Sequence, residues 1–150
     1  MPYNELLNAL LWTVGVTLVT FLLSTILMRW LFGLDLREVE REVEDDQNVA
    51  VGAFFFIISL ALSLFLGFMA SDGFTTGATP ELAWVVYGLL LAFVLAGLGL
   101  WFAVHVLSGS SESIIAYLRR EVVDEDNGAL ALFLGSFVLT PFVITALQLI

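Results

Sequence analysis

Four long stretches without Asp, Glu, Lys or Arg constrain this chain more than any other feature of its sequence. They run from Leu6 to Met28, from Asn48 to Ser71, from Leu82 to Ser111 and from Asn127 to Ile150. A bilayer core about 30 Å thick is crossed by roughly 20 helical residues, so each stretch is long enough to span it. Transmembrane strands would alternate apolar with polar residues, and these stretches do not. The sequence therefore predicts an all-α membrane protein with four transmembrane helices, and a mean hydropathy of +1.00 agrees with this.

The first stretch is expected to stay in the mature protein as a membrane anchor. No basic residue precedes it, and it is longer than the apolar core of a typical signal peptide. The chain also has no cysteine, which excludes disulfides, thiolate metal sites and cysteine nucleophiles.

The basic residues predict the orientation in the membrane. All five are arginines, and they follow the first and third stretches: Arg29, Arg37, Arg41, Arg119 and Arg120. Because positively charged connections tend to stay in the cytoplasm, both of these acid-rich loops are predicted to be cytoplasmic. The termini and the short loop 71–80 would then lie outside a cell membrane (an inner or plasma membrane).

The chain contains an internal repeat. At a shift of 79 residues, the segment 41–50 matches the segment 120–129 in Arg, Glu, Val, Asp, Asn and Ala, and each copy stands between two apolar stretches. This pattern indicates duplication of a two-helix hairpin. The single domain, 1–150, would hold two tandem units of the same orientation, 1–71 and 80–150.

Each repeated segment reads as a short cytoplasmic amphipathic helix that leads into a transmembrane helix. Asp35 and Glu38 have capping-box spacing, and Asp45 and Asp124 could cap the helices that follow. Alternatively, the repeated polar residues form a cytoplasmic mouth that binds a cation through oxygen ligands. This candidate site comprises Arg41, Glu42, Asp45 and Asn48 with Arg120, Glu121, Asp124 and Asn127.

These motifs resemble the domain of unknown function 350 family, also called YjfL-like, of small four-helix membrane proteins. Members have two tandem two-helix units, each with a Glu, a short spacer and Asn-x-Ala at the start of its second helix. The matching residues here are Glu42, Asn48 and Ala50, and Glu121, Asn127 and Ala129. A Gly often precedes the Asn in that family, whereas this chain has Gln47 and Asp126. The resemblance implies an architecture but no reaction, ligand or cofactor.

Small and hydroxyl side chains form stripes on the first two spans. The stripes comprise Thr13, Thr17, Thr20 and Ser24 on the first, and Ser59, Ser63 and Gly67 on the second. Such stripes are common where membrane helices pack closely. They could instead line a water-filled path, which would need several subunits because four helices rarely enclose a pore.

Two further residues interrupt the apolar spans. His105, near the inner end of the third span, could relay protons or sense pH, or could make a hydrogen bond at the interface. Pro141 predicts a kink in the fourth helix that serves packing or gating.

The sequence holds too little of a catalytic inventory to predict an enzyme, and it implies no cofactor. We expect an oligomeric channel- or transporter-like module for small cations, embedded in the lipid bilayer. A non-catalytic scaffold that recruits partners through its acidic cytoplasmic helices is the alternative. No cluster of basic residues suggests nucleic acid as a partner.

Overall fold

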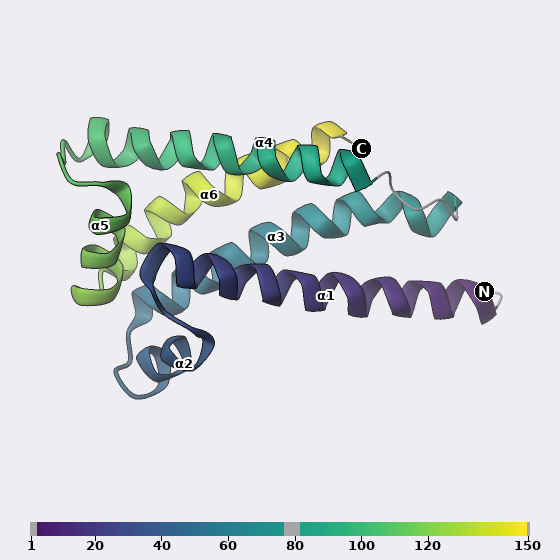
Figure 1. Ribbon diagram of the computed structural model, residues 1–150, viewed down its shortest axis with the longest axis horizontal. Helices are drawn as coiled ribbons and strands as arrows, with labels where there is room; N and C mark the ends of the chain where they lie inside the picture. The colour runs from purple at the N-terminus through teal and green to yellow at the C-terminus, as the bar shows by residue number, and fades with distance from the viewer. Residues whose placement is uncertain (1–2, 77–81, 150) are drawn as a thin grey trace.

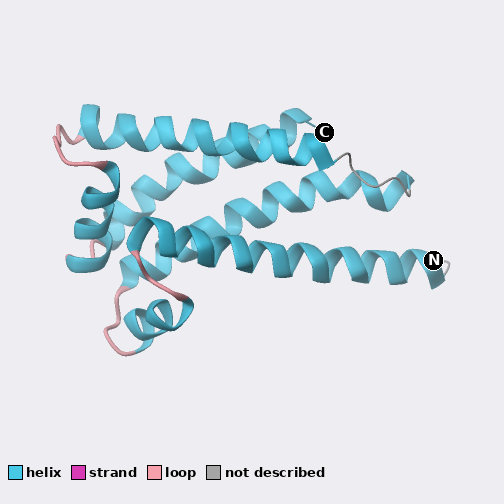
Figure 2. Cartoon of the chain, in the orientation of Figure 1, coloured by secondary structure: helices cyan, strands magenta, loops and turns pink. Residues whose placement is uncertain are grey.

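The fold consists of helices and short connections. The computed structural model describes residues 3–76 and 82–149, and no strand occurs among them (Figure 2). In chain order the elements are α1 (Tyr3–Phe32), α2 (Leu36–Glu44), α3 (Val49–Thr76), α4 (Leu82–Trp101), the π-helical turn η1 (Phe102–Leu107), α5 (Ile114–Leu118), the π-helical turn η2 (Arg119–Asp124) and α6 (Gly128–Leu149). The predicted all-α fold class is confirmed.

Four of these helices are long and apolar enough to cross a membrane, as predicted. The candidate spans are Leu6–Phe32, Val49–Ala70, Ala83–Leu107 and Gly128–Leu149. The first span continues past Arg29 to the end of α1, four residues beyond the predicted stretch. The third span ends with η1, so the Ser-rich segment at the end of the predicted stretch lies outside it. A helix satisfies its own backbone hydrogen bonds, which is the condition for crossing lipid. These four spans are compatible with an integral membrane protein.

Helices α3 and α6 form the centre of the bundle (Figure 1). α1 packs against α3 on one flank, and α4 packs against α6 on the other. Aromatic rings in edge-to-face contact fill the central interface: Phe65 lies 6.1 Å from Phe142, and Phe93 lies 5.0 Å from the same ring. Such pairs add about 0.5–1.5 kcal/mol each beyond burial of their area.

α1 is the least enclosed of the four long helices. Only 11% of its most apolar window is buried inside the molecule, against 44% for α3. Large apolar side chains such as Leu10, Leu18 and Leu22 are about 60% exposed on its surface. This surface is available to acyl chains or to another protein.

The short helices gather at one end of the bundle. In Figure 1, α5 lies at the left edge and α2 lies below it toward the same side, whereas the N-terminal end of α1 lies at the far right. The two arginine-bearing connections therefore share one end; their assignment to the cytoplasm remains a prediction. Of the predicted outer loop 71–80, residues 71–76 belong to α3 and residues 77–80 lie outside the described part of the chain.

The predicted capping box of α2 is confirmed. The Asp35 carboxylate accepts from the Glu38 amide at 3.0 Å, and the Glu38 carboxylate accepts from the Asp35 amide at 2.6 Å. Among the apolar residues of α2, Val39 is buried, whereas Leu36 and Val43 are exposed. The helix therefore begins where its sequence says it should.

α6 continues through Pro141 as a helix. Proline lacks the amide that would bond to the carbonyl four residues earlier, which here belongs to Phe137. α4 lies close to that point, because a Cβ built on Gly99 would come 3.4 Å from the Phe137 oxygen and 3.2 Å from its ring. Glycine thus permits close approach of the two helices at the proline position.

Gly99→Val should loosen the α4–α6 contact, because its Cβ would come within 3.4 Å of the backbone oxygen of Phe137 as well as of its side chain. Overpacking of this kind costs about 1–3 kcal/mol. Gly97→Val is the matched control, since no atom lies within 4 Å of a Cβ built there. Thermal unfolding of the detergent-solubilised protein should show a lower melting temperature for the first variant only; equal melting temperatures would contradict the close packing.

Candidate functional site

The first repeated motif builds the start of α3 around Asn48. The Asn48 side-chain oxygen accepts from the Val51 amide at 2.9 Å, so Asn48 is the N-cap of this helix. Its side-chain nitrogen donates to the Glu42 carboxylate at 3.4 Å, and its backbone amide donates to the Glu42 carbonyl at 2.8 Å. The chain reverses at Gln47, which adopts a left-handed φ of 55°. Glu42 and Asn48 therefore hold this turn together.

The second motif makes the same contacts 79 positions later. The Asn127 oxygen accepts from the Leu130 amide at 3.1 Å, and its side-chain nitrogen donates to the Glu121 carboxylate at 3.2 Å. The Asn127 backbone amide donates to the Glu121 carbonyl at 2.9 Å, and Asp126 has a left-handed φ of 48°. Both Glu–Asn pairs predicted from the sequence are thus brought together by the fold.

The capping role predicted for Asp45 and Asp124 is wrong. Asp45 ends α2 as its C-cap, and Asp124 is the last residue of η2. The caps of α3 and α6 are the asparagines instead. The left-handed turn residues place Asn48 and Asn127 at the helix starts, and Asp45 and Asp124 stay exposed.

The two motifs also bind each other. The Asp126 carboxylate of the second motif accepts from the Ala50 amide in the first turn of α3 at 2.8 Å. The Asn48 side chain donates to the Val123 carbonyl at 3.0 Å. An acidic side chain at a helix N-terminus is stabilised by the positive end of the helix dipole. Gln47 and Asp126 occupy matching positions in the two motifs. They differ in role, because only the Asp126 side chain forms a hydrogen bond with the opposite motif.

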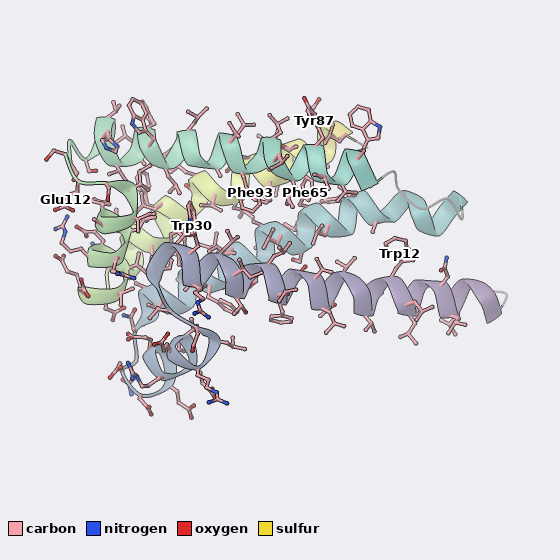
Figure 3. All side chains as sticks on the ribbon, viewed as in Figure 1. Trp12, Trp30, Phe65, Tyr87, Phe93 and Glu112 are labelled. Carbon is pink, nitrogen blue, oxygen red and sulfur yellow. The ribbon has the colours of Figure 1, made fainter. Side chains whose placement is uncertain are left out.

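Arginines add to the contacts at this end of the bundle. Arg119 donates from Nε and from a terminal nitrogen to the Phe32 carbonyl, which closes the C-terminal end of α1 from the second half of the chain. Arg120 pairs with Glu112 at 3.4 Å, with Glu121 at 3.1 Å and with Glu125 at 3.5 Å. Figure 3 shows Glu112 at this end. In the first motif, Arg41 lies 3.9 Å from Glu42.

The contacts of the repeated motif favour its structural interpretation over cation binding. The asparagine oxygens that a cation would need already accept helix amides, and the asparagine nitrogens face Glu42 and Glu121. Among the described residues, no group of three or more His, Asp or Glu side chains could hold a metal ion. The contacts of this motif therefore serve to hold the helix starts and to connect the two halves of the chain.

His105 lies in η1 and interacts within its own helix. Its Nδ1 is 3.1 Å from the Trp101 carbonyl oxygen, and its ring stacks on the Trp101 ring with centroids 5.6 Å apart. A carbonyl can only accept, so Nδ1 carries the proton in this contact. His105 therefore makes a hydrogen bond within the helix, and proton relay, pH sensing and a position at the membrane interface stay predictions.

The hydroxyl stripes meet between α1 and α3. The Ser59 hydroxyl donates to the Ser24 hydroxyl at 3.0 Å. Next to this link is a groove of about 250 Å³ lined by Val16, Thr17, Thr20, Phe21, Phe56, Ser59, Leu60 and Ser63. Thr13 and Gly67 are exposed and do not line the groove. The fold therefore joins four of the predicted stripe residues in one concave surface, which is the strongest candidate for a functional site.

No family model, curated protein or solved structure matches this chain. Its function must be inferred from its own residues.

Asn48→Ala should destabilise the protein more than Asn127→Ala. Both variants lose an N-cap, which costs about 0.5–2 kcal/mol, but only the first also loses the bond to the Val123 carbonyl in the opposite motif. The two substitutions serve as each other's control, because the local contacts are otherwise matched. Thermal unfolding in detergent should rank them in this order, and the reverse order would contradict the inter-motif bond.

Proposed function

We propose that this chain is the subunit of an oligomeric channel- or transporter-like module for small cations. The observation that carries the proposal is that hydroxyl side chains of both α1 and α3, including Thr17, Ser59 and Ser63, line one groove in the middle of the two candidate spans. Thr13 and Thr17 donate their hydroxyl protons to carbonyls of α1 at 2.8 and 2.7 Å. Their oxygens keep lone pairs on an exposed face, which is the chemistry that a hydrated cation needs.

The architecture within this proposal is two tandem two-helix units of parallel orientation, related to the YjfL-like family. Helix α6 begins 79 residues after α3, the same shift that aligns the repeated motifs. The matching Glu–Asn contacts at the two turns support a common origin.

Electrostatics at the end that holds α2 and η2 favour cations over anions. The chain has a formal net charge of −10 at pH 7, and exposed carboxylates lie on these elements and in the turns that follow them. They include Glu40, Glu44, Asp46, Asp124 and Glu125. A surface of one sign raises the local concentration of ions of the opposite sign. In the predicted orientation this acidic end is the cytoplasmic mouth.

Oligomerisation supplies what a single chain lacks. The exposed hydroxyl face of α1 would be open to lipid in a monomer, where polar groups are costly. Copies of the chain that join through the poorly enclosed α1 and the neighbouring face of α3 would place these hydroxyls around a shared path.

A scaffold is the second candidate, and the exposed carboxylates of α2 support it. Glu40 and Glu44 point away from the bundle core and could bind a basic partner. In this case the hydroxyl face would serve only packing between helices.

Flux through liposomes that contain the purified protein separates the two candidates. A conduit should release a potassium gradient faster than empty liposomes do, and chloride should move much less. Thr17→Val combined with Ser63→Val should slow potassium flux roughly tenfold, because both oxygens are lost from the shared face. Thr140→Val is the control, since Thr140 is exposed on α6 and does not line the groove. Tight liposomes at every protein density would overturn the conduit and favour the scaffold.

A further inference from the structure

Two of the five arginines are not bound to other parts of the protein. The other three donate to a backbone carbonyl or pair with carboxylates. The side chains of Arg29 and Arg37 are exposed and make no hydrogen bond or ion pair with any residue of 3–76 or 82–149. The chain has 15 acidic and 5 basic residues, so an arginine without a carboxylate partner is unexpected. Of these two arginines, only Arg29 belongs to a candidate membrane span.

Arg29 lies at the depth of the lipid headgroups. It is three residues before Phe32, where the first candidate span ends. Three residues rise about 4.5 Å along a helix. A long arginine side chain keeps its stem in apolar surroundings and extends its charged head toward the headgroup layer. The neighbouring Trp30 is 67% exposed, and tryptophan is enriched at this level of the membrane. Figure 3 labels Trp30 near the end of α1 that leads to α2.

An exposed apolar stripe on α1 leads to Arg29. Leu18 and Leu22 are 65% and 61% exposed. At about 100° per residue, these two leucines and Arg29 fall within about 40° of one another around the helix. Thr20 and Ser24, which lie on the side of α1 that meets α3, are on roughly the opposite side. The stripe therefore faces away from the bundle and ends at the arginine.

The C-terminal end of α1 does not depend on the Arg29 side chain. A cation near the end of a helix can bind its last free carbonyls. Here the Phe32 carbonyl accepts from Arg119, and the Arg29 carbonyl accepts from the Gly33 amide at 3.0 Å. The guanidinium of Arg29 has five N–H donors, and all of them are left for a group outside the chain.

The second half of the chain lacks this feature. At the shift of 79 residues, Arg29 corresponds to Ser108 and Trp30 corresponds to Gly109. The Ser108 hydroxyl donates to the Val104 carbonyl at 2.7 Å, within its own turn. The arginine without a protein partner is therefore not a requirement of the two-helix unit, because the other unit forms without it.

We propose that Arg29 binds the phosphate group of a membrane phospholipid whose acyl chain lies along Leu22 and Leu18. The planar guanidinium matches two phosphate oxygens, and such charge-assisted pairs are among the strongest hydrogen bonds in proteins. Arg29 is the only charged residue between Glu5 and Asp35, so no carboxylate on this helix competes with the phosphate. The site does not depend on the proposed cation path, because it lies on the other side of α1.

Native mass spectrometry of the full chain in detergent micelles tests the site. The unmodified chain should retain added dioleoylphosphatidylglycerol. Dioleoylglycerol has the same acyl chains without the phosphate and should be retained about tenfold less, which is the effect of one charge-assisted hydrogen bond. Inorganic phosphate and glycerophosphoglycerol carry the phosphate without acyl chains. Neither should displace the bound lipid, because they do not contact the leucine stripe.

Arg29→Gln should reduce retention of phosphatidylglycerol about tenfold and leave retention of dioleoylglycerol unchanged. Arg37→Gln is the matched control, because it removes the same charge from an exposed arginine outside the candidate spans and should bind like the unmodified chain. Both variants should keep the melting temperature, since neither side chain has a partner within the described residues.

Three results would overturn the proposal. The first is equal retention of the two lipids by the unmodified chain, a comparison that needs no variant. The second is an equal loss of phosphatidylglycerol in Arg29→Gln and Arg37→Gln, which would indicate an effect of net charge alone. The third is displacement of the lipid by inorganic phosphate, which would indicate a site for the free anion.

Discussion

Backbone amides at the starts of the central helices set the main constraint on this structure. Ala50 and Val51 in the first turn of α3 are fully buried, as is Ala131 near the start of α6, so the first amides of these helices need partners within the protein. α3 and α6 obtain these partners from Asn48 and Asn127, and each asparagine is held in turn by a glutamate six residues earlier. The acidic composition of the connections is therefore partly a consequence of how the helices begin.

The same end of the molecule joins its two halves. Asp126 completes the start of α3, and Arg119 closes the end of α1 by donating to Phe32. The first half of the chain does not make the same two contacts with the second half. The residue that corresponds to Asp126 is Gln47, and the residue that corresponds to Arg119 is Glu40. Two similar units are thus joined by different residues. Such differences fix which half packs where, because each contact is available in only one arrangement.

The sequence was informative wherever structure depends on neighbouring residues. The four candidate membrane spans could be predicted from the length of the stretches without charged residues. The N-terminal cap of α2 could be predicted from the spacing of Asp35 and Glu38. Asp45 and Asp124 were misplaced because the left-handed turn at Gln47 and Asp126 shifts each helix start by three residues, and neither residue is a glycine that would announce such a turn. The bond from Arg119 to Phe32 joins residues 87 positions apart, and no local pattern marks it. The hydroxyl stripes were visible as composition, but only packing could separate the paired Ser24 and Ser59 from the unpaired Thr20.

The flanks of the bundle suggest a division of roles between the two halves. α4 is held against α6 by aromatic rings and by the close approach at Gly99. α1 meets α3 through hydroxyls and leaves a groove, a buried hydroxyl without a partner and a large exposed apolar surface. Stability and binding make opposite demands on packing, since a filled interface gains dispersion energy and an open one retains unsatisfied groups. A duplicated chain can meet both demands at once, because one copy of the interface can be filled while the other stays open.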